Sequence, residues 1–145
     1  MHKLLLVEDN ATEAELFSEA LKELLLPIEL HVVSDGESAI ETIFGMDPGP
    51  DLVLLDINLP KMSGLEVLRE IRSDHEFALL PVIILTNSNS DADVRNCYEA
   101  RCNAYVQKPM GIDALMDLMR VLSRFWLELV TLPTPTGQTP SEPVP

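Results

Sequence analysis

Five apolar runs of strand character divide this chain, at residues 4–7, 28–33, 51–55, 82–85 and 104–106. The first, third and fourth runs are nearly continuous Leu, Ile and Val, which is typical of strands that are covered on both faces. A half-exposed antiparallel sheet would instead alternate apolar and polar residues. The pattern therefore predicts an α/β fold, a (βα)5 doubly wound parallel sheet with helices on both sides.

Segments of helical period separate these runs. The expected helices span residues 12–25, 37–44, 64–72, 91–101 and 112–129. Asn10 stands where the first helix begins, and Glu13 follows three residues later. This spacing is close to a capping box, with Asn10 in the cap role.

Length and charge limit the classes to which the chain can belong. With 145 residues, 46% of them hydrophobic, it can bury one core, and we expect one domain over residues 1–130. Residues 131–145 are rich in Pro and Thr and should form a disordered or extended tail. The net charge of −14 argues against nucleic acid as a partner. Because the first apolar run is too short for a signal peptide or a membrane span, we expect a cytoplasmic protein that binds no membrane.

Polar side chains that can bind ligands or react follow four of the five runs. They are Glu8 and Asp9 after the first, Asp56 after the third, Thr86 after the fourth and Lys108 after the fifth. The carboxyl ends of parallel strands meet at one edge of a sheet, so these residues should converge there. Any one of them alone would be an ordinary turn or cap residue. The ordered set predicts a site.

The three carboxylates would repel one another, by about 4 kcal/mol for a pair about 4 Å apart at an effective dielectric constant near 20. A divalent cation would relieve that repulsion, and Mg²⁺ suits few carboxylates, with a carbonyl near Asn58 able to contribute. Asp56 stands alone at a central strand end and is the expected nucleophile, which would attack a phosphoryl group to give an acyl phosphate. Glu8 and Asp9 are better placed to hold the metal.

Two further residues can report the modification. Lys108 supplies a positive charge for a phosphoryl or carboxylate oxygen, and the hydroxyl of Thr86 can donate to the new phosphate. Movement of Thr86 would vacate space into which Tyr105 could turn, which would change the surface. Asp56, Thr86 and Lys108 are thus the expected catalytic residues.

These motifs resemble the receiver domain of two-component response regulators over about residues 1–125. The resemblance is carried by Glu8-Asp9-Asn10, the 54–60 segment around Asp56, the Gly64 turn, Leu85-Thr86, Tyr105 and Lys108-Pro109. It implies the flavodoxin-like strand order 2-1-3-4-5. It also implies phosphotransfer from a sensor histidine kinase to Asp56, with Thr86 and Tyr105 as a switch pair and a cis Lys108–Pro109 bond. The implied Mg²⁺ ligands are Glu8, Asp9, Asp56 and the carbonyl of Asn58.

A narrower resemblance concerns residues 125–133, which are similar to the end of single-domain regulators paired with bacterial and cyanobacterial phytochromes. It implies a phytochrome-type kinase as the phosphodonor. Because no output domain follows, we expect a stand-alone regulator whose chemistry is limited to self-phosphorylation and slow autodephosphorylation. Asn58 and Ser88 are poorly suited to activating water, so an intermediate phosphoryl lifetime is expected.

The last helix carries more apolar surface than one sheet face can cover. One stripe contains Leu115, Met119 and Trp126, and a second contains Leu118, Val121, Phe125 and Leu129. The second stripe either packs on its own domain or marks an interface, and an interface is the prediction. The expected homodimer contacts are Leu118, Val121, Phe125, Trp126 and Leu129.

Three rival functions stay open at this point. A haloacid-dehalogenase-like Mg²⁺-dependent phosphatase also uses a nucleophilic Asp, but it needs a second Asp two residues later, where this chain has Asn58. A flavodoxin-like FMN carrier needs a phosphate loop after the first strand, where Glu8-Asp9-Asn10 would repel a phosphate. A scaffold that is not phosphorylated is the third alternative.

Overall fold

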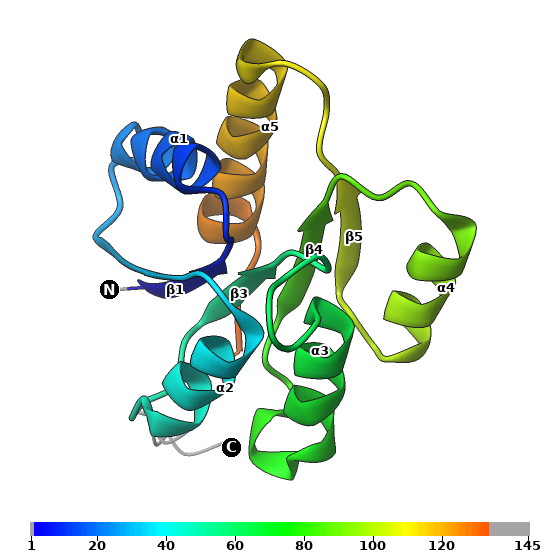
Figure 1. Cartoon of the computed structure of the whole chain (residues 1–145). Helices are drawn as coiled ribbons and strands as arrows, with labels where there is room; N and C mark the ends of the chain where they lie inside the picture. Colours follow the sequence, from blue (N-terminus) through cyan, green and yellow to red (C-terminus); the bar gives the residue numbers. More distant parts are fainter. Residues whose placement is uncertain (1, 134–145) are drawn as a thin grey trace.

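The computed structural model describes residues 2–133 and contains one five-stranded parallel sheet of order β2-β1-β3-β4-β5 (Figure 1). The strands are β1 His2–Val7, β2 Ile28–Val33, β3 Leu52–Leu55, β4 Val82–Thr86 and β5 Ala104–Gln107. The helices are α1 Ala11–Lys22, α2 Gly36–Gly45, α3 Gly64–Ser73, α4 Asp91–Glu99 and α5 Ile112–Arg124. A short 3-10 helix, His75–Phe77, precedes β4, and a π-helical turn, Phe125–Leu129, follows α5. The predicted fold class and strand order are confirmed.

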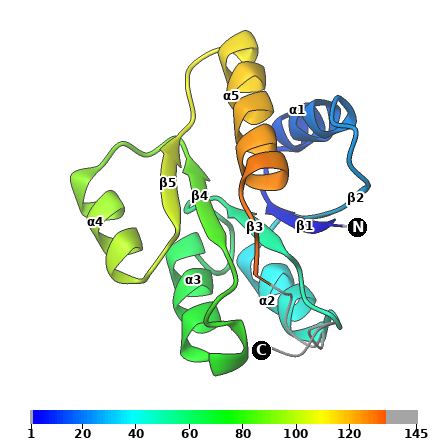
Figure 2. The same cartoon turned by 180° about the vertical axis from the view of Figure 1, so that it is seen from behind.

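Helices cover both faces of the sheet, because successive strand residues point to opposite sides. Leu4 and Leu6 of β1 pack into a cluster with Phe17 of α1 and Met119 of α5. The residues between them point the other way and pack with α2, α3 and Cys97 of α4. Figures 1 and 2 show α1 and α5 together on one side and α2, α3 and α4 on the other. Apolar packing on both faces holds the sheet in place, and the carboxyl ends of its parallel strands meet at one edge.

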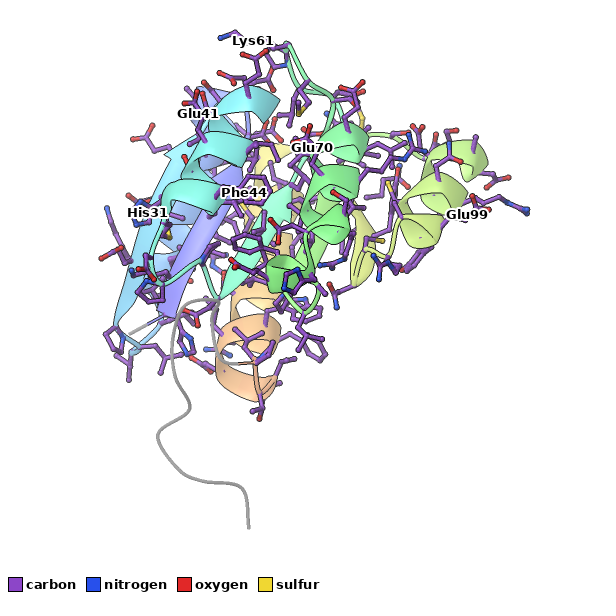
Figure 3. All side chains as sticks on the ribbon, turned by 90° about the horizontal axis from the view of Figure 1, so that it is seen from below. His31, Glu41, Phe44, Lys61, Glu70 and Glu99 are labelled. Atoms are coloured by element: carbon purple, nitrogen blue, oxygen red, sulfur yellow. The ribbon has the colours of Figure 1, made fainter. Side chains whose placement is uncertain are left out.

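The outer face of α2, α3 and α4 is acidic at several exposed positions, among them Glu41, Glu70 and Glu99 (Figure 3). Between the ends of α2 and α3, the ring of Phe44 lies against that of Phe77, with centroids 5.1 Å apart. The acidic surface agrees with the negative net charge, and the aromatic contact anchors α2 to the loop after α3.

Side-chain caps set most helix starts. Ser63 and Glu66 form a complete capping box at α3, and Asp35 and Ser90 cap α2 and α4. Asn10 caps α1 by accepting the N–H of Glu13 at 3.0 Å. Two helices end earlier than predicted: α1 stops at Lys22 and α4 at Glu99.

The end of α5 departs from a regular helix. The N–H of Val130 donates to the carbonyl of Phe125 at 2.8 Å, five residues back, which widens the last turn. Leu127 is buried by this turn, and Leu132 packs against the same cluster as α1 and α5. The chain is thereby held to its own domain beyond the helix.

One expectation about the backbone is wrong. Among the described residues the cis peptide bond is Asp47–Pro48, and Lys108–Pro109 is trans. The two isomers of an X-Pro bond differ by only about 0.5–1 kcal/mol, so local sequence does not fix the choice. The trans chain still lets the N–H of Lys108 donate to the carbonyl of Thr86 at 2.7 Å, which extends the β4–β5 pairing.

The predicted tail falls mainly on residues 134–145, which lie outside the described residues. Within residues 2–133, no helix has the length and apolar character needed to cross a membrane.

Candidate functional site

The carboxyl ends of the strands bring the predicted polar residues together. Glu8 follows β1, Asp56 follows β3, Thr86 ends β4 and Lys108 follows β5. Their exposed fractions are 5%, 6%, 0% and 4% respectively, whereas Asp9 is exposed. A charged or hydroxyl side chain that is this buried must be satisfied by partners inside the protein.

Three carboxylates form the acidic part of the site. One oxygen from each of Glu8, Asp9 and Asp56 lies within 4.8 Å of the others. Main-chain N–H groups orient two of them: that of Asn10 donates to Oε2 of Glu8 at 3.1 Å, and that of Asn58 donates to Oδ1 of Asp56 at 3.1 Å. Hard oxygen ligands at this density fit a divalent cation.

Burial raises the pKa of Glu8 above its ordinary value, although the hydrogen bond and charge of Lys108 pull that pKa down. The net direction is upward, because desolvation outweighs one shared ammonium. Lys108 therefore does not fully compensate the buried charge of Glu8, and the oxygen donors of the cluster fit a divalent cation.

The ammonium of Lys108 is the central positive charge. Its Nζ donates to Glu8 and lies 3.0 Å from Oδ2 of Asp56 and 3.1 Å from Oε1 of Glu13, and the side chain is only 1% exposed. Burial alone would lower its pKa, but Glu8 and Asp56 outweigh burial and raise it above its usual value. Lys108 is therefore charged at neutral pH.

Sequence reasoning did not assign Glu13 to this site. Its position three residues after Asn10 is typical of a capping box, so the sequence indicates a helix-capping role for Glu13 and not a charge in the site. The available signal was its place in the first turn of the helix that follows Glu8, which puts its side chain near the same sheet edge.

Gly64 fixes the loop behind Asp56. Its N–H donates to the carbonyl of Ile57 at 2.8 Å, and a Cβ at this position would come within 2.0 Å of the carbonyl oxygen of Asp56. Only glycine allows α3 to begin so close to the acidic cluster. The Gly64 turn in the sequence thus reflects a close backbone approach.

The β4–α4 loop links Thr86 to Tyr105 indirectly. The N–H of Ser88 donates to Oγ1 of Thr86 at 3.4 Å, and the hydroxyl of Tyr105 donates to the carbonyl of Ser88 at 2.9 Å. The hydroxyl of Ser88 in turn donates to Asp93 at 2.5 Å. Half-buried Tyr105 therefore contacts the loop through a main-chain carbonyl. The role of Asp93 was not found from sequence.

The second stripe of α5 is exposed at most of its positions. Val121 is 64% exposed, Phe125 48% and Leu129 74%, while Leu118 is half-buried. Trp126 is also half-buried and packs against its own core, with its ring edge-on to Phe125 at 5.4 Å. Trp126 thus belongs mainly to the intramolecular side of the helix.

Fold and site together define a receiver domain of two-component signalling, and the chain belongs to that family. The family model for the response regulator receiver domain matches residues 4–120. The chain is 38% identical over 135 residues to "Response regulator Rcp1" from Synechocystis sp. (strain ATCC 27184 / PCC 6803 / Kazusa), which covers 90% of this chain and 92% of that protein.

Solved structures agree. A Mn²⁺-bound form of Rcp1 superposes with a TM-score of 0.89 at 37% identity, covering 92% of this chain and all of that one. The phosphorylated cyanobacterial phytochrome response regulator RcpA superposes with a TM-score of 0.88 at 36% identity, with the same coverage. The chain is therefore a signalling response regulator by family, and the related Rcp1 structure holds Mn²⁺.

Proposed function

We propose that Asp56 accepts a phosphoryl group from the phosphohistidine of a sensor histidine kinase, in a reaction that depends on Mg²⁺. The observation that carries the proposal is the placement of the buried Asp56 carboxylate between the Lys108 ammonium, 3.0 Å away, and the carboxylates of Glu8 and Asp9. A structural ion pair would need only Lys108 and one acid. A bound cation accounts for the additional carboxylates at the site.

The chain's own residues orient the nucleophile. The N–H of Asn58 and the ammonium of Lys108 each hold one oxygen of Asp56, so the carboxylate has a fixed direction. An oxygen of Asp56 attacks phosphorus, the P–N bond of the phosphohistidine breaks, and its electron pair stays on the imidazole nitrogen. Mg²⁺ held by Glu8, Asp9, Asp56 and the carbonyl of Asn58 would supply charge neutralisation for the phosphoryl oxygens.

Lys108 and Thr86 respond to the new phosphate. The ammonium can exchange a carboxylate oxygen for a phosphoryl oxygen, and the buried hydroxyl of Thr86 can donate to another. Because Thr86 is tied to Ser88, and Ser88 to Tyr105, movement of Thr86 pulls on the loop that Tyr105 holds. Thr86 and Tyr105 thus act as a switch pair at the α4–β5 surface.

Return to the resting state is slow self-catalysed hydrolysis. The side chain at Asn58 is neither an acid nor a base that could activate water. The hydroxyl of Ser88 is engaged by Asp93 at 2.5 Å and is not free to orient a water. The phosphoryl group therefore persists for an intermediate time.

The kinase is proposed to be of the phytochrome type. Support comes from the likeness to RcpA, which is described as a cyanobacterial phytochrome response regulator, over 92% of this chain. Phosphohistidine is made from ATP, which supports a cytoplasmic location for the regulator. Residues 1–130 are the proposed phosphorylated unit. No nucleic acid partner is required.

A homodimer through α5 is part of the same proposal. Val121, Phe125 and Leu129 form an exposed apolar stripe on a highly charged protein, and Phe125 offers a large aromatic anchor. Leu118 and Trp126 would border the contact, since both are half-buried. Phosphorylation alters this interface through the adjoining β5 strand, whose Ala104 and Val106 pack against the same cluster as α5.

The test is phosphotransfer profiling. Purified kinases, one of the phytochrome type and several of other types, are autophosphorylated and mixed briefly with the regulator, and transfer is quantified. We expect the phytochrome-type kinase to transfer fastest, by at least about tenfold, since partner choice is a difference of affinities. Equal rates from all donors would refute the kinase assignment, and no transfer from any donor would refute the phosphoacceptor role.

A further inference from the structure

Glu13 is an acidic residue of the site that the proposed chemistry does not use. Its Oε1 lies 3.1 Å from Nζ of Lys108, although residue 13 lies on α1 and Lys108 follows β5. The Glu13 side chain is 17% exposed and the Lys108 side chain 1%. The contact is therefore a partly buried ion pair, which salt screens much less than a pair on the surface.

The local hydrogen bonds free Glu13 for this contact. In a complete capping box the side chain of Glu13 would accept the N–H of Asn10. Here that N–H donates to Oε2 of Glu8 at 3.1 Å, while Asn10 still caps the N–H of Glu13. The first half of the box holds Glu13 in place, and its carboxylate turns toward the ammonium.

The three acidic partners of Lys108 have different fates. Glu8 and Asp56 are shared between the ammonium and the proposed cation, and Asp56 also carries the phosphoryl group. Glu13 is outside the carboxylate group that can hold a metal. It is the partner that Lys108 can keep when the other two are drawn toward a cation.

We propose that Glu13 is a positioning residue that acts through Lys108. By keeping the buried ammonium paired, it lowers the cost of withdrawing Glu8 and Asp56 from Lys108, and so permits the cation to bind beside a nearby positive charge. This inference rests on the proposed function, because it concerns the loading of the same site.

The experiment is a double-variant cycle on Mg²⁺ affinity of the unphosphorylated full chain, measured by titration calorimetry with Mg²⁺ alone. Glu13→Gln removes the charge and keeps the shape. Lys108→Met removes the ammonium. If Lys108→Met does not fold, Lys108→Gln is used in its place. Glu15→Gln is the matched control, because it removes an exposed charge from the same helix.

Glu13→Gln should weaken Mg²⁺ binding by about tenfold, and Glu15→Gln by less than about twofold. In the Lys108→Met background, which lacks the ammonium, the effect of Glu13→Gln on Mg²⁺ affinity should be no larger than that of Glu15→Gln. A simple field effect of the Glu13 charge would instead persist in that background and would overturn the inference. An effect of Glu13→Gln no larger than that of Glu15→Gln would also overturn it.

Wild-type results separate the two proposals. If the wild-type chain binds no Mg²⁺, both the proposed function and this inference fail. If it binds Mg²⁺ and Glu13→Gln binds equally well, the inference alone fails.

Discussion

Replacing Lys108 by Met should lower the free energy of unfolding, because the buried carboxylates would lose their positive partner. The Lys108 side chain is 1% exposed, and its ammonium contacts the carboxylates of Glu8, Glu13 and Asp56. Removing one partner of a buried ion pair costs about 3–5 kcal/mol, because the remaining charges lose their compensation. With a urea slope of about 2 kcal/mol/M, the midpoint should fall by about 2 M in EDTA.

The cost should depend on pH through Glu8. Without Lys108, the hydrogen bond and charge that lower the pKa of Glu8 are gone, so burial raises that pKa further. A folded pKa above the unfolded value gives stability at low pH that is lost as pH rises through the folded pKa. The variant should therefore be less destabilised near about pH 5 than near about pH 8.

Urea unfolding at both pH values, with and without Mg²⁺, measures these effects. Mg²⁺ should restore stability to the variant by about 2.7 kcal/mol at a concentration one hundred times its Kd. Lys22→Met is the matched control, because its pair with Glu19 at 3.1 Å is exposed and should contribute less than about 1 kcal/mol. An equal cost at both pH values, or a cost no larger than that of the control, would refute the reasoning.

Three further predictions concern the switch, the loop and the dimer. Thr86→Ala should still be phosphorylated by acetyl phosphate but should lose the phosphorylation-dependent change in oligomeric state, and an unchanged response would contradict its role. Gly64→Ala should lose about 3 kcal/mol in urea unfolding, the upper end of the usual cost of overpacking, because its Cβ would strike the backbone, whereas Gly45→Ala, which has open space, should lose less than about 1 kcal/mol. Phe125→Asp should give monomers in sedimentation equilibrium while Leu25→Asp, at a 99% exposed site, should not; a wild type that is monomeric at tens of micromolar, both with and without phosphorylation, would contradict the interface.

The sheet could be predicted from sequence because its strands are buried on both faces. A run such as residues 52–55 has no polar position, so its strand assignment and its central place were both readable. Helix ends were less accurate: α1 stops at Lys22, before the three leucines that lead to Pro27. Apolar residues there continue the helical period although the chain has already turned toward β2.

The site was predictable to the extent that topology brings strand ends together. Glu8, Asp56 and Lys108 each follow a strand directly, so parallel order alone places them side by side. Glu13 lies inside a helix, and its partner is chosen by a hydrogen bond of Asn10 that the sequence does not reveal. The isomer at Lys108–Pro109 was mispredicted because the energy difference is small.

The central claim is that Asp56 is the phosphoacceptor, and intact-mass measurement after incubation with acetyl phosphate and Mg²⁺ tests it most directly. The wild-type chain should gain one phosphoryl group that hydroxylamine removes, as expected of an acyl phosphate. Asp56→Asn should gain none while keeping the wild-type circular dichroism spectrum, and Asp117→Asn, at an exposed position on α5, should be labelled like the wild type. Undiminished labelling of Asp56→Asn would contradict the account.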